Sequence, residues 1–327
     1  MEGTPKTTEG TPTTTTKEAR TAPTTSELPV SPAKRAAVWL GPLLAGAATL
    51  IWSGNFVIAR ALSDDIAPVQ TAFWRWAIAL LALAPFAAKG LWEHRAAIRK
   101  HTRYIALVGL LGMTLFNTLI YIAGRTTSAT NLALIAAASP VLIAVFAALG
   151  GERLSPVRAA GMLLALAGVV ALVAKGSLAV LFGMDFAVGD LWMIAAMGTF
   201  AGYSALLKRK PKDIPSVVFL AATVLFGLVM LVPAQAVSLY VEGGFTPTGG
   251  NLAALVYIGV ASSALAFFVW NKAVEMIGAT RAGVVYYLQP VCVAALAHFA
   301  IGEASTLAQF ACMGLIIAGV ALSSSRR

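Results

Sequence analysis

Charged residues are scarce in this sequence of 327 residues. Only 12% of the chain is Asp, Glu, Lys or Arg and 58% is hydrophobic, whereas about a quarter of an ordinary soluble domain is charged. The mean hydropathy is +0.80. One soluble core cannot hide so much apolar surface, but lipid accepts it without penalty. The composition therefore argues against a soluble globule and predicts a polytopic membrane protein.

Cysteine and histidine are also scarce. The two cysteines, Cys292 and Cys312, fall inside apolar stretches without metal-ligand or redox spacing, and the three histidines are dispersed. We therefore expect no metal and no cofactor. The chain also lacks a phosphate-binding glycine loop and a Ser-His-Asp set that could converge within the spans, so we do not expect an enzyme.

Acidic residues are missing from the positions where a proton-coupled transporter needs them. None of the 14 Asp and Glu residues lies in the middle of an apolar stretch, whereas proton relays use membrane-embedded carboxylates. His298 can titrate near neutral pH, but a single histidine near a helix end more often has a structural role. For a transporter, this pattern favours facilitated diffusion or weak coupling.

The apolar stretches predict the fold. Residues 1–35 are rich in Thr and Pro and offer little apolar surface, so we predict a disordered cytoplasmic tail. Ten stretches follow, each long enough at 1.5 Å per residue to approach or cross a hydrocarbon core of about 30 Å. We predict an all-α protein with ten transmembrane helices, or nine or eleven if residues 177–188 enter the interface. The stretches are roughly 36–62, 67–88, 104–123, 131–149, 157–174, 187–207, 216–236, 251–270, 282–301 and 306–323.

The basic residues predict the orientation. With the N-terminus in the cytoplasm, 20 of the 24 Lys and Arg residues fall on the cytoplasmic side and only Arg60, Arg125 and Lys175 fall in external links. Such a bias places both termini inside. The net charge of +10 therefore reflects membrane orientation rather than nucleic-acid binding. Arg75 alone is not explained by this rule.

The chain contains an internal repeat. Residues 128–155 align with residues 278–306, sharing Ala-Thr, a Pro twelve positions into the match and Gly-Glu near its end. We predict two five-helix repeats, 36–175 and 187–323, and the odd number of spans inverts the second repeat in the membrane. Inverted repeats are typical of transporters with an alternating-access site at the bilayer midplane.

These motifs resemble a known family. The segments "SPVLIAVFAALGGERLS" and "QPVCVAALAHFAIGEAST" resemble the EamA-type branch of the drug/metabolite transporter superfamily, over about residues 40–323. The segment "LIWSGNFVIAR", followed by an Arg in the second span, is similar to YddG-type bacterial exporters of aromatic amino acids. The resemblance implies ten helices around a hydrophobic central cavity in the bacterial cytoplasmic (inner) membrane. It also implies outward transport of small amphipathic solutes.

The leading functional hypothesis is an exporter of aromatic or neutral amino acids, with a small-molecule substrate and the lipid bilayer as its partners. A broader drug/metabolite or sugar-phosphate exchanger on the same fold is an alternative. Phosphate, however, needs several buried Lys or Arg residues, and only Arg75 is available. An intramembrane enzyme, or a membrane signalling protein that binds a partner through the Thr/Pro-rich tail, is a further alternative.

Residues that bind such solutes should be aromatic or polar and lie well inside the spans. An amide such as Asn55 or Asn117 can instead hydrogen-bond a neighbouring helix. Trp192 and Trp270, near span ends, are more typical of the interfacial aromatic belt. The predicted substrate-binding residues are Trp52, Asn55, Arg75, Asn117, Tyr121, Phe200, Tyr203, Ser204, Ser263, Phe267, Tyr286, Tyr287 and Gln289.

Two prolines are predicted to break helices or to serve in gating. Pro140 and Pro290 occupy equivalent positions of the two repeats, and a proline within a helix frees a backbone carbonyl one turn earlier. Such a carbonyl lines a cavity or packs against a neighbour. Tyr286, Tyr287 and Gln289 lie within one turn of Pro290, which makes this the densest group of candidates.

Arg75 lies between Trp74 and Trp76, about 10 Å inside the external end of its helix. This depth is within snorkelling reach of the interface. Its own helical face consists mostly of small residues, so we expect Arg75 to point into the bundle. Two interpretations remain open. Arg75 is either a structural residue bonded to carbonyls or to a carboxylate such as Asp64 or Glu303, or an anchor for a substrate carboxylate.

Overall fold

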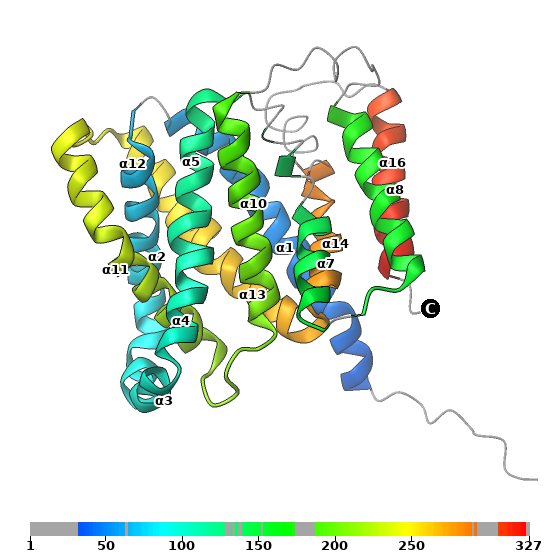
Figure 1. Cartoon of the computed structure of the whole chain (residues 1–327), viewed down its shortest axis with the longest axis horizontal. Helices are drawn as coiled ribbons and strands as arrows, with labels where there is room; N and C mark the ends of the chain where they lie inside the picture. The colour runs from blue at the N-terminus through cyan, green and yellow to red at the C-terminus, as the bar shows by residue number, and fades with distance from the viewer. Residues whose placement is uncertain are drawn as a thin grey trace, which may run out of the picture.

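The described part of the chain is helical, as predicted. The computed structural model describes residues 32–62, 65–127, 132, 135–136, 139–151, 153–173, 187–289, 291–292 and 307–324, and contains no β-strand among them (Figure 1). Predictions for the tail before residue 32, for residues 177–186, and for Pro290, His298 and Glu303 lie outside the described residues.

Five helical stretches among the described residues are long and apolar enough to cross a membrane by length and composition. Each coincides with a predicted span, and two of them contain a π-helical segment. They are α2 (Pro68–Glu93), the run of α4 (Thr102–Gly109), η1 (Leu110–Leu115) and α5 (Phe116–Thr126), α10 (Val188–Leu207), α11 (Ser216–Glu242), and the run of α12 (Gly249–Val256), η2 (Tyr257–Leu265) and α13 (Ala266–Ile277).

Five further helices fall in the remaining predicted spans. They are α1 (Pro32–Leu62), α7 (Ser139–Leu149), α8 (Pro156–Val173), α14 (Ala279–Tyr286) and α16 (Leu307–Ser324). The short helix α3 (Arg95–Lys100) lies in the charged link that precedes α4, where the sequence pattern indicated only a connection.

Local sequence sets where several helices begin and end. Pro68 opens α2, where its missing N–H costs no hydrogen bond. Thr248 and Asn251 cap α12 reciprocally, because each side-chain oxygen accepts from the other residue's backbone N–H. Helix α11 stops at Gly243 (φ 76°) and α13 at Gly278 (φ 83°), and glycine tolerates these positive φ angles.

Helices from distant parts of the sequence pack side by side. Helix α2 packs along α11, α8 along α16, α1 against α13 and η2, and α10 against α5 and η1. Figure 1 shows the α8–α16 pair beside the other helices. Two glycines permit close approach: a Cβ on Gly109 would lie 2.6 Å from the carbonyl oxygen of Thr223 in α11, and one on Gly259 would lie 2.6 Å from Cβ of Ile78 in α2. Small residues at such crossings are typical of membrane helices.

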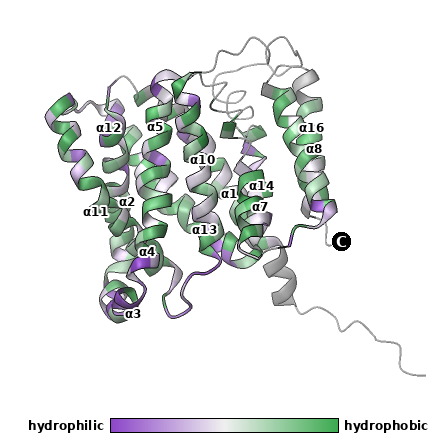
Figure 2. Ribbon diagram, in the orientation of Figure 1, coloured by the Kyte–Doolittle hydropathy of each residue, from purple (hydrophilic) through white to green (hydrophobic). Residues whose placement is uncertain are grey.

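The outer faces of the helices are apolar. Large side chains such as Leu81 (72% exposed), Phe86 (76%) and Leu149 (81%) point away from the bundle, as a lipid-facing surface requires. Figure 2 shows hydrophobic residues along the helices, with hydrophilic ones concentrated in α3 and near helix ends. Many of the polar side chains that lie within the spans are buried inside the bundle instead.

Candidate functional site

Arg75 points into the bundle, as predicted. Its side chain is 1% exposed, and Thr71, Ala72 and Ala79 on the same face of α2 are also buried. The two flanking tryptophans lie in different environments: Trp76 is fully buried, whereas Trp74 is 41% exposed on the outer face. The guanidinium therefore does not snorkel to the interface. It is held inside the protein, where an arginine marks a functional or an interhelical site.

Four groups accept hydrogen bonds from the Arg75 guanidinium. Nη1 donates to Oδ1 of Asn55 in α1 (3.0 Å) and to the hydroxyl of Tyr121 in α5 (2.9 Å). Nε donates to Oγ of Ser263, and Nη2 donates to the backbone carbonyl of Ser262 (3.1 Å), both in η2. The fold thus brings three predicted residues, Asn55, Tyr121 and Ser263, onto one arginine. The fourth partner is a backbone oxygen, as the structural interpretation of Arg75 expected, although which carbonyl it would be was not predicted.

The Ser262 carbonyl lies in the π-helical segment η2. π-helical turns shift the backbone hydrogen-bond register and occur frequently at functional sites. The Ser263 hydroxyl donates to the carbonyl of Ile258, five residues earlier (2.7 Å). The Ser262 carbonyl accepts the indole Nε1–H of Trp52 (2.8 Å) as well as Nη2 of Arg75. Side chains from α1 and α2 therefore meet at one oxygen of η2.

A cluster of aromatic rings adjoins this polar site. The Trp52 ring lies 5.3 Å from the rings of both Phe267 and Trp270 and 5.6 Å from that of Phe200, measured between centroids. The Trp76 ring lies 5.0 Å from that of Phe267 and 5.5 Å from Cζ of Arg75, so it joins the rings to the charge. We call Trp52, Trp76, Phe116, Phe200, Tyr203, Phe267, Trp270 and Tyr286 the central aromatic cluster.

The cluster confirms that Trp52, Phe200, Tyr203, Phe267 and Tyr286 lie together, and it adds three rings. The interfacial prediction for Trp270 was wrong: its side chain is fully buried, and Nε1 donates to Oγ of the predicted residue Ser204 (3.3 Å). By contrast, Trp192 is 43% exposed. Trp76 and Phe116 were missed, although Trp76 follows the buried residues of α2 at helical spacing.

Three predicted residues have other surroundings. Asn117 is buried, and its Nδ2 donates to the carbonyl of Gly112 (3.4 Å) in its own helix run, not to the neighbouring helix that the structural alternative expected. Tyr287 packs in a separate apolar cluster with α8 and α16, away from its neighbour Tyr286. Gln289 hydrogen-bonds the Tyr286 side chain, so it adjoins the cluster. Pro140 is the second residue of α7.

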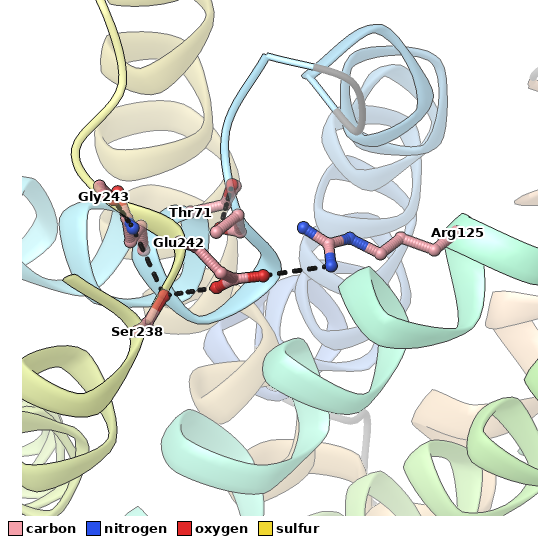
Figure 3. A network of polar contacts seen from close by, with 7 residues as sticks. Thr71, Arg125, Ser238, Glu242 and Gly243 are labelled. Carbon is pink, nitrogen blue, oxygen red and sulfur yellow. Dashed lines mark hydrogen bonds and ion pairs between the residues drawn. The ribbon is translucent and has the colours of Figure 1, made fainter. Parts of the chain in front are cut away.

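A second polar network lies where α2 begins and α5 and α11 end (Figure 3). Arg125 and Glu242 form an ion pair at 3.1 Å, and the other Glu242 oxygen accepts from the Ser238 hydroxyl (2.6 Å). Gln70 Nε2 donates to Ser238 Oγ (3.2 Å) and to the carbonyl of Gly243 (2.7 Å). The network joins α2, α5 and α11 at one end of the bundle.

Two pockets lie outside the central aromatic cluster. A pocket of about 170 Å³ lies beside the Arg125–Glu242 pair, and another of about 530 Å³ is lined by residues 99–104. Neither is lined by a member of the central aromatic cluster. Because these rings pack against one another, a solute can enter the cluster only when the rings move apart.

The charge of Arg75 is not neutralised by its described surroundings. All four partners are neutral groups, and no ion pair joins Arg75 to a carboxylate among the described residues. The carboxylates suggested from sequence, Asp64 and Glu303, lie outside the described residues. Guanidinium groups form strong hydrogen bonds with carboxylates and phosphates, and aromatic side chains pack against apolar groups.

Comparison with known proteins identifies the family. Residues 39–174 and again residues 187–325 match the EamA-like transporter family. The chain belongs to the EamA-like transporter family. As a member, it is a multi-pass membrane protein and a transporter rather than an enzyme. This finding confirms the resemblance seen in the sequence motifs.

Several relatives of this EamA-like protein carry names. It is 30% identical to an "Uncharacterized transporter" of Archaeoglobus fulgidus over 87% of this chain and 97% of the relative. It is 27% identical to a "Probable terminal-alkyne amino-acid exporter" of Streptantibioticus cattleyicolor over 84% of this chain and 90% of that protein. It is 26% identical to the "Aromatic amino acid exporter YddG" of Ancylobacter novellus over 66% and 74% of the two chains.

The fold is also similar to that of a solved structure. The EamA-like chain superimposes on a protein crystal structure with a TM-score of 0.70 at 25% identity. The match covers 86% of this chain and 96% of the other. The helical arrangement described above is therefore shared with a known protein along most of its length.

Proposed function

We propose that this protein exports small amphipathic solutes, most of all aromatic or neutral amino acids, by alternating access at the central aromatic cluster. One observation carries the proposal: a fully buried guanidinium with neutral partners lies against a cluster of aromatic rings. A carboxylate matches the guanidinium fork, and the rings match an aromatic or aliphatic side chain. The names of two relatives as amino-acid exporters support this substrate class.

Binding exchanges partners at Arg75. A substrate carboxylate accepts from Nη1 in place of Asn55 or Tyr121, while Nε and Nη2 stay on η2. Because the substrate adds a negative charge that the present partners lack, this exchange strengthens the hydrogen bonds. The displaced side chain then turns to the substrate or to water. The Asn55 amide and the Tyr121 hydroxyl therefore serve as partners of Arg75 in the empty state.

We further propose that the ten spans form two inverted five-helix repeats, 36–175 and 187–323. The family matches the chain twice, once in each proposed repeat. Each repeat contains a π-helical segment in its third span, η1 and η2, and each segment supplies a carbonyl to an indole N–H: Met113 to Trp76 and Ser262 to Trp52. Gly109 directly precedes η1, and Gly259 lies within η2. These two glycines, which allow close helix contacts, occupy matching positions of the two repeats.

The packing also supports alternating access between the repeats. The first helix of each repeat packs against the third and fourth spans of the other repeat. Helix α1 packs on α13 and α14, and α10 packs on α5 and α7. The contacts of Arg75 and Trp52 with η2 cross from the first repeat to the second. Relative movement of the repeats would therefore open the cluster and break these contacts together.

The remaining parts of the proposal concern orientation and energy source. The bias of basic residues supports both termini in the cytoplasm of a bacterial inner-membrane protein. The absence of acidic residues from the middle of the spans favours facilitated or weakly coupled transport. An imposed pH gradient should therefore change the export rate in proteoliposomes little, and strong acceleration would contradict this part.

A counterflow screen in proteoliposomes tests the function. Liposomes loaded with one unlabelled solute should accumulate the same labelled solute, and we expect exchange of phenylalanine, tryptophan and large neutral amino acids. Protein-free liposomes provide the background. Exchange of a cationic drug or a sugar phosphate, without exchange of any aromatic or large neutral amino acid, would overturn the substrate assignment. It would leave the transporter fold intact.

A further inference from the structure

The charge balance at Arg75 restricts the class of substrate more sharply than the fold does. The guanidinium is 1% exposed, and its four described partners contribute no negative charge. A charge buried in a low-dielectric interior is costly unless an opposite charge accompanies it. The site as described therefore carries one uncompensated positive charge.

Ligands with the same aromatic group but different charges give the occupied site different net charges. A monocarboxylate brings the total to zero, a zwitterionic amino acid leaves one positive charge, and an amine raises it to two. Since attraction and repulsion between buried charges are screened only weakly, the monocarboxylate is the best match. None of the described partners of Arg75 is a carboxylate that could pair with the ammonium group of an amino acid.

Two other buried polar groups near the cluster have no described partner. Nδ2 of Asn271, whose Oδ1 accepts from Tyr203, can only donate, whereas the Ser262 hydroxyl can donate or accept. The carbonyl of Ser262 already accepts from Trp52 and Arg75. Spare donors suit the oxygens of a carboxylate or a keto group, whereas an ammonium needs spare acceptors.

We propose that the Arg75 site selects aromatic monocarboxylates, with or without a keto group, over the corresponding zwitterionic amino acids. The protein then exports deaminated aromatic acids in addition to amino acids. This inference rests on the proposed function, because it assigns the same site as the transport site. It differs from the proposed function in one respect: the α-ammonium group of the substrate is not needed for binding and weakens it.

Three compounds isolate the charged groups. Phenylalanine carries both groups, 3-phenylpropionate lacks the ammonium group, and phenethylamine lacks the carboxylate. Equilibrium binding of each labelled compound to the purified full-length protein in lipid nanodiscs avoids the leak of a weak acid through lipid. We expect 3-phenylpropionate to bind about tenfold or more tightly than phenylalanine, since relief of a buried like-charge contact exceeds about 1.4 kcal/mol. Phenethylamine should bind most weakly.

A variant ties this order to the arginine. In Arg75→Gln the positive charge is gone, so the binding ratio of 3-phenylpropionate to phenylalanine should fall toward one. Arg75→Lys keeps the charge and should preserve the order of the three compounds at lower affinity. The melting temperature in detergent identifies a variant that does not fold. In that case the order in which the wild-type protein binds the three compounds still tests the proposal.

The outcomes separate this inference from the proposed function. If phenylalanine binds as tightly as 3-phenylpropionate or more so, the preference for monocarboxylates is wrong, while amino-acid export stands. If phenethylamine binds most tightly, both the inference and the anchoring role of Arg75 fail. If counterflow shows that none of the three is carried, the proposed function fails and the inference fails with it.

Discussion

Replacing Arg75 by Gln removes the charge and most of the hydrogen bonds at the centre of the proposed site. Asn55 Oδ1, the Tyr121 hydroxyl and Ser263 Oγ lose their donor, at about 1–3 kcal/mol for each stranded group. Removing a charge from the membrane interior offsets about 2.5–3.5 kcal/mol of this loss. The Ser262 carbonyl keeps the Trp52 indole as a donor. We therefore expect the variant to fold, with a net loss of a few kcal/mol.

The effect on substrate should be larger. Truncating one partner of a buried charged pair costs about 2–5 kcal/mol of binding, which is roughly thirtyfold or more in affinity for a carboxylate. Binding of labelled phenylalanine in nanodiscs and counterflow in proteoliposomes measure this loss, while thermal unfolding and membrane abundance report on folding. Arg75→Gln should thus separate transport from stability.

A charge-matched control uses Arg95→Gln. Arg95 is exposed on α3, where it lies over the Trp92 ring and outside the bundle centre, so we expect no change in binding. The anchor interpretation is refuted if Arg75→Gln is stable and binds carboxylates within about threefold of wild type, since tenfold corresponds to 1.4 kcal/mol. A variant that loses its fold together with its transport would support the purely structural interpretation instead.

Three further changes test the cluster, the packing and the end network. Trp52→Phe keeps a ring and loses one hydrogen bond, about 1 kcal/mol, so KM for phenylalanine should rise less than tenfold. Trp52→Ala also loses ring pairs of about 0.5–1.5 kcal/mol each, so its KM for phenylalanine should rise more than tenfold. In Gly259→Leu the new side chain meets Ile78, so we expect a lower melting temperature and less protein in the membrane, and a variant as stable as wild type would contradict the close packing. Glu242→Gln breaks a partly exposed pair with Arg125 that is worth about 0–1 kcal/mol, so export should change less than fivefold, and a complete loss would indicate a larger role.

The spans and the inward face of α2 could be predicted because their causes are local. Apolar length predicts each membrane helix, and helical spacing places Arg75 among small buried residues. The same reasoning found Asn55, Tyr121 and Ser263 as polar residues inside spans, without indicating that all three meet one guanidinium. Their meeting depends on how α1, α5 and η2 pack on α2.

The errors have a common origin. Trp270 lies near a predicted span end, but α13 continues to Ile277, so the tryptophan falls inside the bundle. Tyr286 and Tyr287 look equivalent in sequence, yet successive helical residues point about 100° apart. One therefore joins the central aromatic cluster and the other packs against α8 and α16. Span boundaries and neighbouring helices decided both cases.

The sequence by itself determined that this is a helical membrane protein whose second span carries an inward-facing arginine, because hydropathy and periodicity act over a few turns of chain. The EamA-like type was indicated only by the resemblance of two motifs to that family. Only the tertiary structure decided that the arginine has neutral partners, one of which is the Ser262 carbonyl of a π-helical segment. A free backbone oxygen has no signature in residue identity, since it depends on the local hydrogen-bond register and on which helix lies opposite.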